Sequence, residues 1–91
     1  MTEPLTPEVR DLLTAIRDAL DVPISHWHTE DEQARARILD ARAAAARITV
    51  EGILESGHHI AHSTAYLAGR TAETPITYTV WQPLADSGEQ A

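Results

Sequence analysis

The sequence predicts an all-α fold, a three-helix hairpin or bundle with one long central helix and a short extended segment near the C-terminus. Three observations lead to this prediction. Apolar residues recur at helical spacing, no proline lies between Pro23 and Pro75, and β-branched and aromatic residues alternate over 76–81. The 91 residues provide one domain, which we expect to span 1–84, followed by a flexible tail at 85–91.

The first helix is expected from about Thr6 to Leu20. Thr6 suits the N-cap position, and Pro7 suits the first helical position because its missing N–H would have no partner there. Pro23 ends the helix, since a residue before proline avoids the α conformation. The apolar side chains of its inner face are those of Val9, Leu12, Leu13, Ile16 and Leu20.

The central helix is expected over about 30–56. Thr29 and Glu32 have the spacing of a capping box, in which each side chain accepts a hydrogen bond from the backbone amide of the other residue. Gly57 suits the position after the helix, where a left-handed conformation is common. Apolar residues cover so much of the circumference that the helix needs cover on two sides. Five charged residues cluster in one narrow polar arc: Arg37, Asp40, Arg47, Glu51 and Glu55.

A further helix is expected from about His58 to Ala72, and the chain is then extended over 76–81. Because His58 and His62 are four residues apart, they would project from one face of this helix, as paired imidazole ligands of a metal do. Zn²⁺ or Ni²⁺ would suit such a pair, and we expect no other cofactor. The alternative is that both histidines lie exposed in a first helical turn without a special role.

The composition excludes several classes of function. The chain has 14 acidic residues, seven basic ones that are all Arg, a net charge of −7, and no Cys. Without Cys, disulfide scaffolds, thiolate zinc sites and cysteine nucleophiles are excluded. No serine has the Gly-x-Ser-x-Gly context and no glycine-rich phosphate loop is present, so we expect no enzyme.

The sequence also predicts the location of the protein. No stretch reaches the ~18–20 apolar residues that a membrane helix needs. The first residues carry no positive charge and no apolar run, so we expect no signal peptide, no membrane association and a cytoplasmic protein.

A DNA-associated regulator is an alternative function. Gly57 followed by 60–67 resembles the second helix of a helix-turn-helix, and 76–81 would be its wing. The charge argues against nucleic acid, because phosphate contacts need Lys or Arg and this half of the chain offers only Arg70.

The leading hypothesis is a non-enzymatic protein-interaction domain, most simply a homodimer that pairs through apolar helix faces. Arg42 lies in the apolar arc of the central helix, where it would either bind a partner's carboxylate or pack its stem while the guanidinium reaches solvent. Ala45 belongs to an alanine run that lets a second helix approach closely. Tyr78 and Trp81 would either fill the core or anchor a partner.

The loop after the first helix carries two more large apolar residues, Ile24 and Trp27. Because the loop is short, we expect both to pack against the core.

Four segments carry a resemblance to known proteins: 15–23, 52–54, 60–67 and 75–78. In these segments the chain resembles short uncharacterised proteins of actinobacteria and their phages. The resemblance implies a small helical fold and a setting in a mobile genetic element. It implies no activity and no functional residue.

Overall fold

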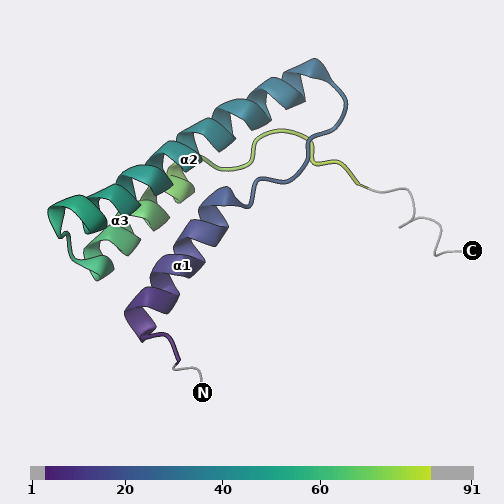
Figure 1. Ribbon diagram of the computed structural model, residues 1–91. Helices are drawn as coiled ribbons and strands as arrows, with labels where there is room; N and C mark the ends of the chain where they lie inside the picture. The colour runs from purple at the N-terminus through teal and green to yellow at the C-terminus, as the bar shows by residue number, and fades with distance from the viewer. Residues whose placement is uncertain (1–3, 83–91) are drawn as a thin grey trace, which may run out of the picture.

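The computed structural model describes residues 4–82 and folds them into α1 (Pro7–Leu20), α2 (Thr29–Ser56) and α3 (Ile60–Glu73). The long helix α2 spans the molecule, α3 folds back beside its C-terminal half, and α1 packs against both (Figure 1). The predicted all-α fold with a long central helix is therefore confirmed. The predicted tail at 85–91 lies outside the described residues. Within 4–82, no helix is both long and apolar enough to cross a membrane.

Two of the predicted helix caps are confirmed and one is wrong. The Thr6 hydroxyl caps α1 by accepting a hydrogen bond from the Val9 amide at 3.2 Å. Gly57 ends α2 with a left-handed φ of 67°. The predicted capping box at the start of α2 is absent, because Thr29 is already the first helical residue and His28 takes the cap position without a side-chain hydrogen bond.

The third helix starts at Ile60, two residues later than predicted. His59 is extended and occupies the cap position, and His58 belongs to the turn. The His58 imidazole lies against α2 at Gly52, where a Cβ would be 2.6 Å from its Nδ1 atom. The His58 amide also donates to the Gly52 carbonyl at 3.1 Å. These contacts hold His58 against α2, so it is not part of α3.

Two clusters of buried side chains form the core. The first lies where the three helices meet, and alanines make up most of it. Its only large buried side chain is Leu67, which is fully buried; the other members are Ala15, Ala19, Ala45 and Ala46. The second cluster lies on the N-terminal half of α2 and contains Val22, Ile38 and Tyr78. Because alanines bury little surface, the hydrophobic core of the described chain is small.

The second cluster is covered by two connecting segments, 22–28 and 76–82, which we call the ribbon. They run antiparallel, with the His26 amide donating to Thr79 O and the Trp81 amide donating to Ile24 O, both at 2.9 Å. Figure 1 shows them side by side next to the N-terminal half of α2. The predicted extended segment at 76–81 is thus confirmed, and it pairs with this chain's own loop.

Arg42 lies at the junction of the three helices and is only 7% exposed. Its Nε and Nη2 atoms donate to the Thr74 carbonyl at 3.0 and 2.8 Å, and Nη1 donates to the Asp18 carbonyl at 3.4 Å. Asp18 lies in the last turn of α1 and Thr74 caps the end of α3, so the cation meets the partial negative charge of two helix C-termini.

These positions correct the prediction of a partner-facing Arg42. The guanidinium binds backbone carbonyls of its own chain and is buried, and it pairs with no carboxylate of the described residues. Ala45 is equally unavailable to a partner, because it is 2% exposed and packs in the first cluster.

Candidate functional site

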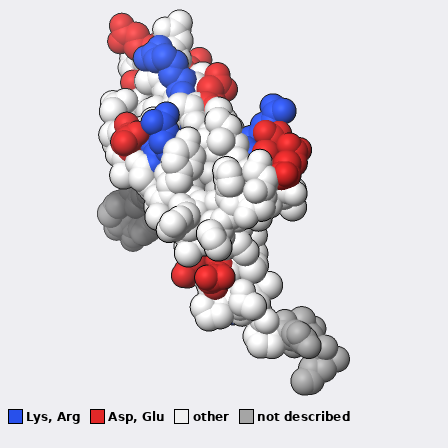
Figure 2. All heavy atoms as spheres, turned by 90° about the vertical axis from the view of Figure 1, so that its left-hand side faces the viewer, with Lys and Arg blue, Asp and Glu red and all other residues white. Residues whose placement is uncertain are grey.

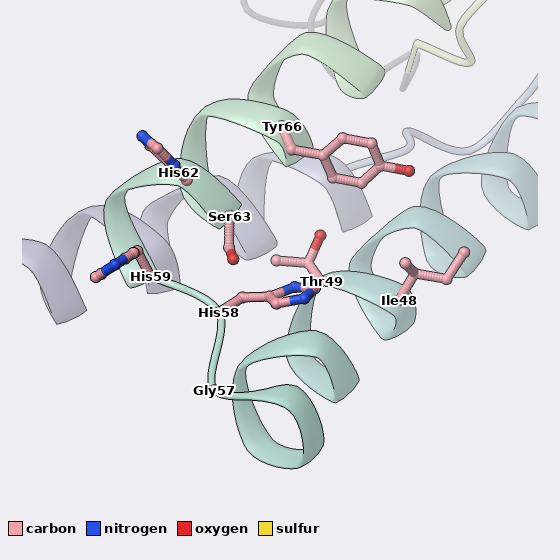
Figure 3. Close-up of a pocket in the computed structure, with 8 residues that line it drawn as sticks. All are labelled: Ile48, Thr49, Gly57, His58, His59, His62, Ser63 and Tyr66. Atoms are coloured by element: carbon pink, nitrogen blue, oxygen red, sulfur yellow. The ribbon is translucent and has the colours of Figure 1, made fainter.

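A groove of about 650 Å³ runs between α2 and the start of α3. Figure 3 shows its lining side chains on the facing surfaces of the two helices and on the turn that joins them. Those residues are Ile48, Thr49, Gly57, His58, His59, His62, Ser63 and Tyr66.

The inner wall of the groove is polar. His58, Ser63 and Thr49 converge between the helices (Figure 3). The Thr49 hydroxyl donates to the Ala45 carbonyl of its own helix at 2.8 Å, and in the described part of the chain no hydrogen bond joins the His58 side chain to Ser63. Within residues 4–82, the groove lining includes no carboxylate that could orient a histidine base.

The rim of the groove is apolar and uncharged. Ile48 on α2 is 57% exposed, and Tyr66 on α3 is also exposed. None of the lining residues is Asp, Glu, Lys or Arg. Figure 2 looks onto the end of the molecule where α2 passes into α3, and it shows groups of charged side chains around a broad uncharged area.

The predicted pairing of His58 and His62 on one helix face is wrong, because His58 precedes α3. Among the three histidines that line the groove, the rings that approach each other are those of His59 and His62, with centroids 6.0 Å apart and an edge-on orientation. Both point away from His58 (Figure 3). Among residues 4–82, no three His, Cys, Asp or Glu residues are grouped so that they could hold a metal ion.

The ribbon presents a second exposed surface, which differs from what the sequence predicts. Tyr78 is buried and its hydroxyl donates to the Pro23 carbonyl, so it belongs to the core, which was one of the two alternatives. Trp81 is exposed as predicted for an anchor, whereas Ile24 and Trp27 do not pack in the core and are 65% and 80% exposed.

The exposure of Ile24 and Trp27 has a local cause. Ser25 takes the buried position in the paired segment, so the neighbouring Ile24 points outward by the alternation of an extended chain. Trp27 follows the last paired residue, His26, and precedes α2. Trp27 is the functional candidate that the sequence reasoning missed. Side chains alternate between inward and outward positions along 76–81. The same alternation over 24–26 would have indicated that Ile24 points outward.

The structure adds little support for DNA binding by a helix-turn-helix. The helix that would enter a DNA groove, α3, carries Arg70 as its only basic residue, and Arg70 forms an ion pair with Glu73 at 2.9 Å. Few cationic groups are therefore available for phosphate.

No protein-family model, curated protein or solved structure matches this chain. Its function must therefore be argued from the site. The groove offers apolar side chains and hydrogen-bonding groups, and none of its lining residues in the described chain is Asp, Glu, Lys or Arg. Such a surface suits contact with another protein.

Proposed function

We propose that this chain is a non-enzymatic protein-interaction domain that pairs with a second copy of itself through the groove between α2 and α3. The main support for the proposal is that the rim of this groove is uncharged, whereas the whole chain has a net charge of −7. Two acidic copies repel each other, so they approach at the lowest electrostatic cost through a face without carboxylates.

The small core supports the same proposal. Leu67 is the one large side chain of the described chain that is fully buried, while several large apolar residues stay exposed. Chains of this size often gain stability by association, because one small core contributes only a few kcal/mol. In a twofold dimer each groove would receive Ile48 and Tyr66 of the other copy, which adds apolar burial on both sides.

Sedimentation equilibrium of the full chain tests this proposal. We expect a dimer at micromolar concentration. Ile48→Glu should raise the dimer dissociation constant at least about tenfold, since two carboxylates would then be buried in the interface. Ile24→Glu is the matched control, because Ile24 is at least as exposed but lies on the ribbon. Circular dichroism establishes that both variants remain helical.

Two outcomes would contradict the proposal. One is a monomer at concentrations up to about 1 mM, at which association would contribute no more than about 4 kcal/mol. The other is an equal loss of dimer in Ile48→Glu and Ile24→Glu. This result would mean that an added charge weakens the dimer whether it lies in the groove or on the ribbon.

Zinc or nickel binding by His58 and His62 has less support, because the two side chains do not share a helix face. We expect the melting temperature to be the same with zinc and with a chelator. A zinc-dependent increase that His62→Ala abolishes would instead favour the metal-binding function.

A further inference from the structure

The two tryptophans and Ile24 form a second surface at the other end of α2, which we call the tryptophan surface. Trp27 and Trp81 together line two grooves of about 660 and 410 Å³. Trp27 is 80% exposed, and Ile24 lies beside it in the larger groove. Tryptophan is enriched among the residues that dominate binding energy at protein interfaces, so its exposure on a helical domain needs an explanation.

The tryptophan surface is built on a well-fixed frame. Backbone hydrogen bonds join the two segments of the ribbon on either side of Ser25. Arg35 of α2 donates to the carbonyls of Pro23 and Val22 at 2.9 and 3.2 Å, which ties the ribbon to the helix. A surface held in this way loses little conformational freedom when a partner binds.

The first two turns of α2, at the end of the helix that meets the tryptophan surface, carry three acidic residues and one arginine. Glu30, Asp31 and Glu32 form the first turn of α2, and none of them belongs to the ion pairs of the described residues. Glu32 lines the larger groove together with both tryptophans. Arg35 also lines it, but its Nε and Nη2 atoms already donate to backbone carbonyls.

We infer that the tryptophan surface docks a polypeptide segment that carries both basic and apolar side chains. A Lys or Arg of that segment can reach the Glu32 carboxylate and lie over an indole ring, while apolar side chains fill the two grooves. A second copy of this chain is a poor occupant, because it would bring three more carboxylates to the same place. This inference is independent of pairing through the groove between α2 and α3.

Tryptophan fluorescence tests the inference directly, because the chain contains two tryptophans and both line this surface. The probe is a synthetic eight-residue peptide of alternating Arg and Leu, and its control replaces each Arg with Glu. We expect the Arg–Leu peptide to shift the emission to shorter wavelength and to saturate below about 1 mM. The shift should weaken as salt is added, and the Glu–Leu peptide should leave the emission unchanged.

Matched charge variants locate the binding site. Glu32→Gln should weaken the binding of the Arg–Leu peptide at least about threefold, within the range of an exposed charge contact. Glu51→Gln removes the same charge from α2 outside the grooves of the tryptophan surface and should leave binding unchanged. The Ile48→Glu variant should bind the peptide like the unmodified chain, which separates this surface from the proposed dimer interface.

Three results would overturn the inference: no saturable shift, equal binding of the Arg–Leu and Glu–Leu peptides, or equal weakening by Glu32→Gln and Glu51→Gln. The last result would mean that the peptide follows the net charge of the protein and has no preference for the tryptophan surface.

Discussion

Replacing Arg42 with methionine is expected to lower the free energy of unfolding by about 3 kcal/mol. Methionine keeps an apolar stem in the core but removes the donors that reach the Thr74 and Asp18 carbonyls. A buried acceptor left without a partner costs about 1–3 kcal/mol. We assign about 2 kcal/mol to the Thr74 carbonyl, which loses two short hydrogen bonds, and about 1 kcal/mol to the 3.4 Å hydrogen bond to the Asp18 carbonyl, which keeps the Asp21 amide as a donor.

Urea unfolding followed by circular dichroism measures this loss. All variants are compared at one protein concentration, because association would change apparent stability. With a slope of about 1–3 kcal/mol per molar urea, the midpoint should fall by at least about 1 M. Arg47→Met is the control, since its ion pair with Glu51 is exposed and contributes less than about 1 kcal/mol.

A methionine variant as stable as the unmodified chain would refute the reasoning. Burying a guanidinium has a desolvation cost, and replacing buried ions with apolar side chains sometimes stabilises a protein. That result would mean that the desolvation cost of Arg42 exceeds the contribution of its hydrogen bonds to two helix ends.

Three further substitutions test single contacts. Tyr78→Phe removes the hydroxyl that donates to Pro23, so the free energy of unfolding should fall by about 1 kcal/mol, and an unchanged urea midpoint would contradict this. Gly57→Ala forces a Cβ into a left-handed conformation, so thermal unfolding should show a loss of about 1–2 kcal/mol. Gly52→Ala should push the His58 ring out of the groove between α2 and α3, and unchanged NMR signals from the His58 imidazole would argue against that contact.

The parts of the fold that depend on near neighbours could be predicted from the sequence. Thr6 caps a residue three positions away, and Gly57 ends α2 through its own backbone conformation. The start of α3 could not be placed, because the contact between His58 and Gly52 on the preceding helix delays it. Helical periodicity does not report such contacts between elements.

The candidate sites were predicted less well, because they depend on contacts between distant residues. Arg42 is buried only because the ends of α1 and α3 meet at its guanidinium, and the carbonyls it binds are 24 and 32 residues away in the sequence. Trp27 is exposed because the loop before it pairs with 79–81. This pairing places Ser25 in the buried position, so the large apolar side chains of the loop lie outside the core. Neither outcome follows from composition or spacing.

The ribbon also affects which part of the fold unfolds most easily. The N-terminal half of α2 is covered by two segments whose contact joins Ser25 to Val80, while its C-terminal half packs on α1 and α3. Residues so far apart in the sequence pair at a high loop-closure cost and are expected to meet late in folding. Native-state hydrogen exchange should therefore reveal two cooperative units on one continuous helix. In the less stable unit, the amides of 32–38 would exchange together with those of His26 and Trp81.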